Sequence, residues 1–90
     1  MDFEWDETKS EVNQSKHGVS FDAALWVFHD ADRISWIDGR RDYGEERRNV
    51  VGRVGGIALY VSFTMRGDVC RLISAHQANK KERQRYGDRP

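Results

Sequence analysis

The sequence predicts a single α+β domain, in which an antiparallel sheet of three to four strands packs with two N-terminal helices and a C-terminal helix. Three observations lead to this fold class. Helix-capping residues open two stretches near the start, alternating apolar residues follow in the middle, and charged helix formers end the chain. Because the chain has 90 residues, one core fills it, and we expect the domain to span residues 1–90.

The N-terminal third predicts a short strand and two helices. Residues 3–5 alternate apolar and polar side chains, as a half-buried strand does. Asp6 is a favourable N-cap for a helix that runs to about Lys16, and Gly18 can take the left-handed conformation that ends it. Ser20 caps the second helix. The buried stripe of that helix has the i, i+3, i+4, i+7 spacing and consists of Phe21, Ala24, Leu25 and Phe28.

The middle of the chain predicts strands. Extended segments are expected over residues 33–37, 46–53, 57–64 and 69–74. The third of them is the clearest, because apolar side chains alternate along one of its faces. Short glycine-containing connections join the last three segments as antiparallel hairpins.

A closing helix completes the expected fold. The stretch Ser74-Ala75-His76-Gln77 fits a capping box, so this helix is expected to start at the end of the last strand and to stop at Gly87. Its apolar row is weak, and most of its long polar side chains must face water or a partner. We expect the helices to pack mainly on one face of the sheet.

The charges balance but are unevenly distributed. The 15 basic and 15 acidic residues cancel, which argues against indiscriminate binding of nucleic acid, because that binding depends on the release of phosphate counterions. Residues 1–30 are mainly acidic and residues 71–90 mainly basic. Two interpretations stay open: the two ends pack together, or the basic end forms a functional face.

Cysteine content and hydropathy exclude several classes. Cys70 is the only cysteine, so neither an internal disulfide nor a zinc site built from thiols can form. Every apolar stretch is far shorter than the roughly 18 residues that a membrane span requires, and the acidic start is unlike a secretory signal. We expect a cytoplasmic protein with no membrane contact.

The reactive side chains favour one kind of chemistry. The sequence has no phosphate-binding glycine-rich loop, no His/Cys metal spacing and no serine nucleophile elbow. The remaining His, Glu, Arg and Lys side chains suit metal-free RNA cleavage: a base takes the proton of the 2′-hydroxyl, cations stabilise the phosphate charge, and an acid protonates the leaving 5′-oxygen. Such a site needs no cofactor, and it excludes DNA, which lacks the hydroxyl.

Two candidates lie near the end of the last strand. Strand alternation places Arg71 with Val69 and Ile73, and Ser74 on the opposite face, so Arg71 needs a carboxylate, an edge or a phosphate. His76 falls in the first turn of the expected closing helix, where the dipole favours the neutral, base-competent imidazole. The alternatives are a salt-bridged arginine and a surface histidine.

Three further candidates lie at strand ends. Glu46 would serve as base or orienting group, and Arg47 as a phosphate ligand, if both face a cleft with His76. Otherwise they form a solvated strand end. Arg66, at a hairpin tip, is either a phosphate contact or a plain turn residue.

Lys16 and His17 end the first helix. Cations at the negative end of a helix dipole are favoured by about 0.3–1 kcal/mol, which is sufficient reason for both residues. A place on a reactive surface is the alternative.

Five short motifs, in order and at near-constant spacing, are similar to those of a known family. They are FEWDE at 3–7, KHGVSFDAA at 16–24, GEERRNVVG at 44–52, YVSFTMRGDVCRLISA at 60–75 and KKERQRY at 80–86. Together they extend over almost the entire chain, which resembles the BrnT ribonuclease toxins.

The resemblance implies a RelE-like α+β toxin of a type II toxin–antitoxin system, which cleaves RNA without a metal and inhibits translation in the bacterial cytoplasm. It also implies a BrnA-type antitoxin that covers the active surface and contacts operator DNA, so that the toxin meets DNA only indirectly. The implied assembly is a heterotetramer with two copies of each protein.

The reactive side chains and the resemblance together give two expected sets. The expected catalytic residues are Lys16, His17, Glu46, Arg47, Arg71 and His76, and the expected RNA-binding residues are Arg66, Lys80, Arg83 and Tyr86. His17 suits the acid role and His76 the base role, although His76 departs from the family pattern, in which an Arg is common after I-S-A. Tyr86 would stack on a base or, alternatively, close the last helix against the sheet.

A non-catalytic interpretation stays open. In it, the chain is a toxin-like binding module that acts as antitoxin ligand or co-repressor, and the balanced charge, which predicts weak affinity for free RNA, favours this mildly. The nuclease interpretation requires side chains far apart in the sequence to gather around one phosphodiester.

Overall fold

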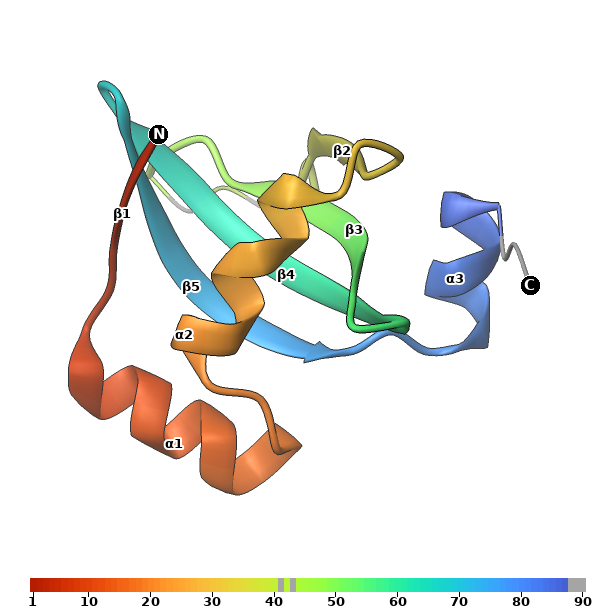
Figure 1. Cartoon of the computed structure of the whole chain (residues 1–90). Coiled ribbons are helices and arrows are strands. Elements are labelled where there is room, and N and C mark those ends of the chain that lie inside the picture. Colours follow the sequence, from red (N-terminus) through yellow and green to blue (C-terminus); the bar gives the residue numbers. More distant parts are fainter. Residues whose placement is uncertain (41, 43, 88–90) are drawn as a thin grey trace.

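The computed structural model describes residues 1–40, 42 and 44–87 (Figure 1). In chain order its elements are β1 (Asp2–Glu4), α1 (Glu7–His17), α2 (Phe21–Ala24), the 3₁₀ helix η1 (Leu25–His29), β2 (Ile34–Ile37), β3 (Arg48–Val54), β4 (Ile57–Arg66), β5 (Val69–Gln77) and α3 (Lys80–Tyr86). The α+β class is confirmed. Within the described residues, none of the helices is long and apolar enough to cross a membrane.

Within the described residues, the sheet has five strands in the order β1-β5-β4-β3-β2. Strands β2 to β5 are antiparallel neighbours, as predicted, whereas β1 pairs parallel with β5. The prediction of a wholly antiparallel sheet of three to four strands was therefore wrong. Hairpin signals report only strands adjacent in the sequence, and no local signal indicates that the first strand lies beside the last.

The second predicted helix begins where expected but changes type. The Ser20 hydroxyl accepts a hydrogen bond from the Ala23 N–H at 3.2 Å and caps α2. After one turn the chain tightens into η1, so the two predicted N-terminal helices are α1 and a composite of α2 and η1. Phe21 and Ala24 are fully buried, which confirms the predicted stripe at these positions.

The closing helix starts later than predicted. Residues 74–77 belong to β5, and their backbone groups pair with β4 as far as Leu59↔Gln77. The helix α3 has its capping box at Asn79 and Glu82, where each side chain accepts a hydrogen bond from the other's backbone N–H at 2.8 and 2.9 Å. Because β4 is long enough to continue the ladder, sheet pairing outweighs the helix-start signal at Ser74.

The two faces of the sheet carry separate clusters of buried side chains. We call the first the core face; α1, α2 and η1 cover it, with Val50, Val61 and Phe63 at its centre. On the opposite face, here the α3 face, Val51, Ala58, Tyr60, Ala78 and Tyr86 pack together. Figure 1 shows α3 set apart from α1 and α2. The expectation that helices pack mainly on one face thus fails for α3.

A bulge in β5 changes which side chains share a face. Ser62 pairs with Ser74, whereas the next residue, Phe63, pairs with Leu72, so Ile73 is an extra residue. Beyond this point the alternation is shifted by one. Ser74 therefore lies on the α3 face with Arg71, and not on the opposite face as simple alternation predicted.

The N-terminal helix closes an open sheet edge. β1 pairs with β5 only as far as Glu4↔Arg71, which leaves the later part of that edge without a strand. Asn13 occupies it: its Nδ2 donates to the carbonyl of Ala75 at 2.7 Å and to that of Val19 at 2.8 Å, and its Oδ1 accepts from the Ala75 N–H at 3.2 Å. The buried Asn13 amide thus replaces a neighbouring strand.

Gly52 allows η1 to approach β3 closely. A Cβ atom at this position would lie 2.9 Å from the Val27 carbonyl oxygen and 3.2 Å from the Val27 Cβ. Real Cβ atoms do not come so near a backbone oxygen, so any other residue would push η1 from the sheet.

We predict that Asn13→Ala destabilises the fold by about 1–3 kcal/mol, because it leaves both backbone polar groups of Ala75 without partners. Urea unfolding followed by circular dichroism measures this change. Gln14→Ala, at the adjacent exposed position of the same helix, is the control and should change stability by less than about 0.5 kcal/mol. Equal stability of the two variants would contradict the role assigned to Asn13.

We predict that Gly52→Ala costs about 1–3 kcal/mol, because the added methyl group overpacks the contact with Val27. Thermal unfolding provides the measurement. Gly39→Ala is the matched control, since a Cβ there meets no atom within 4 Å. The interpretation fails if Gly52→Ala unfolds at the same temperature as the control.

Candidate functional site

Two histidines from distant parts of the sequence lie side by side. His17 ends α1 and His76 lies near the end of β5, and their ring centroids are 5.8 Å apart. The Asn13 contact with β5 positions the end of α1 here. Lys16, the neighbour of His17, is exposed. Two imidazoles at this spacing can both contact one group that is bound against their edges.

A carboxylate orients one of the two imidazoles. His76 Nε2 lies 3.1 and 3.2 Å from the two oxygens of Glu82. Because a carboxylate only accepts, neutral His76 carries its proton on Nε2 and leaves Nδ1 as the acceptor. The His76 ring also stacks on Tyr60, with centroids 4.9 Å apart. The expected helix dipole does not act on His76, which is a strand residue; Glu82 takes the orienting position instead.

Tyr60, whose ring stacks on His76, carries a protonated hydroxyl on the α3 face. Burial raises the pKa of Tyr60, and the nearby positive charge of Arg40 opposes that shift only in part. The hydroxyl therefore keeps its proton at neutral pH and is available as a donor.

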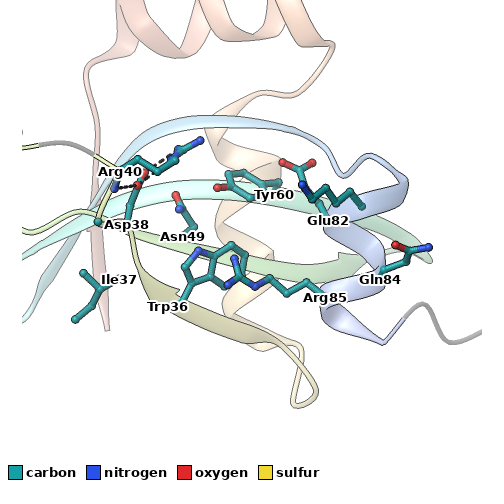
Figure 2. A pocket seen from close by; sticks show the side chains of 11 residues that line it. Trp36, Ile37, Asp38, Arg40, Asn49, Tyr60, Glu82, Gln84 and Arg85 are labelled. Atoms are coloured by element: carbon teal, nitrogen blue, oxygen red, sulfur yellow. Dashed lines mark hydrogen bonds and ion pairs between the residues drawn. The ribbon is translucent and has the colours of Figure 1, made fainter.

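A cavity of about 790 Å³ opens on the α3 face next to Tyr60 (Figure 2). It lies between β2, β3 and β4 on one side and α3 on the other. Figure 2 shows Arg85 reaching from α3 to the indole of Trp36, where its guanidinium carbon lies 4.0 Å from the ring centroid. The Trp36 and Tyr60 rings are 5.8 Å apart. Four rings therefore form a row from the cavity to the histidine pair: Trp36, Tyr60, His76 and His17.

The far wall of the cavity holds a charged pair. Asp38 accepts hydrogen bonds from Arg40 Nε at 2.9 Å and from its terminal nitrogen at 2.8 Å. These bonds, together with those from the Arg40 backbone and the Asn49 amide, hold the pKa of Asp38 far below its usual value although burial opposes them. Asn49 also accepts from the Ser62 hydroxyl at 2.8 Å. Asp38 is thus an ionised and fully engaged carboxylate.

The other predicted catalytic residues, apart from Lys16 and the two histidines, lie at the end of the sheet where the β4–β5 hairpin turns, together with Arg66. Arg71 pairs with Glu4 at 3.6 Å, Arg66 with Glu45 at 3.7 Å, and Arg48 with Glu46 at 3.1 Å. Arg47 directly precedes β3, and its carbonyl accepts from the Asp38 N–H. We refer to this region, defined by Glu46, Arg47, Arg66 and Arg71, as the hairpin cluster.

The hairpin cluster and the histidine pair are separate. Arg71 and His76 share the α3 face because of the bulge in β5. At about 3.3 Å per strand residue, however, their backbones lie roughly 15 Å apart. The structure therefore does not gather all six predicted catalytic residues around one phosphodiester.

The predicted RNA-binding residues of α3 occupy different environments. Lys80 is exposed at the start of the helix. Arg83 donates to the carbonyl of Ala78 at 2.9 Å. Tyr86 is only 7% exposed, and its hydroxyl donates to Asp30 at 2.7 Å. In this position Tyr86 closes α3 against the sheet and offers no ring face for a base.

Neither Cys70 nor a metal-binding cluster provides a second candidate site in the described residues. Burial raises the pKa of the Cys70 thiol to about 12, so it stays protonated and inert at neutral pH. In the described ranges no three His, Cys, Asp or Glu residues are grouped so that they could hold a metal ion.

Sequence reasoning missed Glu82, which orients His76, and the residues that line the neighbouring cavity. Glu82 is the fourth residue of the segment N-K-K-E, whose capping pattern was available as a helix-start signal. Trp36, Tyr60, Arg40 and Arg85 left no comparable signal, because their roles depend on which face of the sheet they reach.

Comparison with known proteins gives a match to a protein family. Residues 5–82 match the family model described as ribonuclease toxin, BrnT, of type II toxin-antitoxin system. The match includes the histidine pair, Glu82 and the hairpin cluster. Comparison with the curated proteins found no match. Since the family model spans most of the sequence, the chain belongs to the BrnT family of ribonuclease toxins of type II toxin–antitoxin systems.

Proposed function

We propose that this toxin cleaves RNA without a metal ion, with His17 and His76 as the acid and base. The observation that carries the proposal is the 5.8 Å spacing of the two imidazoles, one of which is oriented by Glu82. A positioned acid and base each contribute typically 10²- to 10⁴-fold to a reaction rate.

The proposed reaction starts at a ribose 2′-hydroxyl. His76 Nδ1 takes the hydroxyl proton, and the 2′-oxygen attacks the adjacent phosphorus. The bond from phosphorus to the 5′-oxygen breaks, and His17 gives its proton to that oxygen. The products are a 2′,3′-cyclic phosphate and a free 5′-hydroxyl, and the protons balance between the two imidazoles.

Charge on the phosphate oxygens needs nearby donors in the transition state. The Tyr60 hydroxyl is one such donor on the α3 face, and the exposed Lys16, which precedes His17 in α1, is a candidate cation. Donors that are held in place before the reaction stabilise developing charge more than mobile water does.

The hairpin cluster serves flanking phosphates in this proposal. Arg66 and Arg71 each pair with a carboxylate at a partly exposed position, where such a pair is weak. A phosphate of the RNA strand can displace the carboxylate. At roughly 15 Å from His76, these arginines reach phosphates away from the bond that is cut.

A type II toxin has an antitoxin partner, and we propose one of the BrnA type. It would cover His17 at the end of α1 together with His76 and Arg71 on the α3 face. Two copies of each protein would form the complex in the cytoplasm, and only the antitoxin would contact DNA. The chain's own net charge of zero supports this division of roles.

We predict that His17→Gln and His76→Gln each lower RNA cleavage by about 10²- to 10⁴-fold while the fold is retained. His29→Gln is the matched control, because His29 stacks on Trp26 away from the pair. Purified protein is incubated with RNA in the presence of a chelator. Wild-type cleavage that requires added metal would overturn metal independence, and full activity of both variants would remove the pair from the mechanism.

We predict that Arg71→Gln raises KM with little change in kcat, because the lost contact holds substrate and transition state equally. The salt dependence of binding should weaken by about 0.7 in the slope of log K against log[salt], the value for one phosphate contact on a single strand. Arg33→Gln is the control, since Arg33 donates to the Asp30 carbonyl instead. An unchanged salt slope would show that Arg71 binds only Glu4.

A further inference from the structure

The cavity on the α3 face has an aromatic surface, and one ring of that surface, Tyr60, also stacks on His76. Trp36 presents its ring to the cavity, and Tyr60 links it to His76 with ring distances of 5.8 and 4.9 Å. This row is continuous across β2, β4 and β5. A planar group on Trp36 would therefore be separated from the histidine pair by one ring, that of Tyr60.

The aromatic surface is covered by a side chain that can be displaced. Arg85 lies over the Trp36 ring at 4.0 Å, and Arg85 is itself exposed on α3. Trp36 is partly buried, but a cation–π contact made by a solvent-exposed guanidinium is weak. Nucleobases stack on the same two kinds of surface, aromatic rings and guanidinium planes.

The charges around the cavity suit an anionic ligand. Arg40, Lys81 and Arg85 line it, against the carboxylates of Asp38 and Glu82. Asp38 and Arg40 neutralise each other and Glu82 contacts His76, so Lys81 and Arg85 are the cations offered to an anionic ligand. Cations at the rim of an aromatic surface match a phosphate attached to a planar base. A volume of about 790 Å³ falls in the range of small-ligand pockets and admits one nucleotide.

We propose that this cavity binds one nucleotide of single-stranded RNA next to the cleaved bond, with its base stacked on Trp36. The base displaces Arg85, which turns to the nucleotide's phosphate together with Lys81. The inference deepens the proposed nuclease function and rests on it. The cavity therefore sets the base preference beside the cut, whereas the hairpin cluster contacts only the backbone.

The first experiment measures binding without cleavage. A labelled single-stranded 12-mer of 2′-O-methyl RNA lacks the free hydroxyl that the reaction needs, and fluorescence anisotropy reports its affinity. Trp36→Ala should weaken binding by about 10- to 100-fold, the usual effect of losing one stacked base. Trp36→Phe should retain most of the affinity. Trp26→Ala, at an exposed tryptophan outside this cavity, is the matched control and should bind as wild type does.

The second experiment measures cleavage of an RNA library by the same variants and by Arg85→Gln. The expected result is that Trp36→Ala reduces the base preference beside the cut and raises KM, while Trp26→Ala changes neither. Cleavage with unchanged preference and affinity in both Trp36→Ala and Arg85→Gln would overturn the proposal. So would a loss of antitoxin binding by Trp36→Ala with RNA binding intact.

The two experiments separate this inference from the nuclease function. If wild-type protein binds the 12-mer through Trp36 but cleaves no RNA, the nuclease proposal fails and the nucleotide site is supported. If cleavage depends on His17 and His76 but not on Trp36, the nuclease proposal stands and the nucleotide site is wrong. Misfolding of Trp36→Ala would not by itself decide the outcome, because two other variants test the same site. Trp36→Phe keeps an aromatic ring, and Arg85→Gln changes an exposed side chain, so both are expected to fold.

Discussion

The geometry of the site depends on one buried amide, that of Asn13, which closes a part of the sheet edge that no strand covers. It satisfies both backbone polar groups of Ala75, and leaving either without a partner at this buried position would cost about 1–3 kcal/mol. The end of α1 therefore cannot move away from β5 at low cost. His17 lies one helical turn after Asn13 and on the same side of the helix, so the contact that completes the sheet also places His17 beside His76.

The bulge in β5 and the late start of α3 complete the arrangement. Without the extra residue Ile73, the alternation of β5 would put Arg71 and His76 on opposite faces of the sheet. The same strand continues to Gln77 before the chain turns, which brings Glu82 back over His76 and Arg85 over Trp36. The short helix α3 thus supplies both Glu82, which orients His76, and Arg85, which lies over Trp36. Its attachment rests on the capping box and on the buried ring of Tyr86.

Sequence reasoning named candidate residues, and the structure places them in more than one region. His17 and His76 lie side by side, whereas Glu46, Arg66 and Arg71 form ion pairs with neighbouring charges at the hairpin end. Two stretches of the sequence, Ser74 to Gln77 and Asn79 to Glu82, satisfy the same capping pattern. Only the length of the partner strand β4 decides which of them starts the helix, and a local pattern does not contain that length.

The sequence by itself determined the α+β class, the caps of α1 and α2, the hairpins among β3, β4 and β5, and the family through motifs whose order and spacing are local properties. The tertiary structure alone decided that β1 lies beside β5, that the helices divide between two faces, and that Trp36, Tyr60, His76 and His17 form one row. The physical reason is the range of each interaction. Caps and turns are satisfied within a few residues, whereas strand register and ring contacts join residues distant in the sequence and exist only once the sheet has formed.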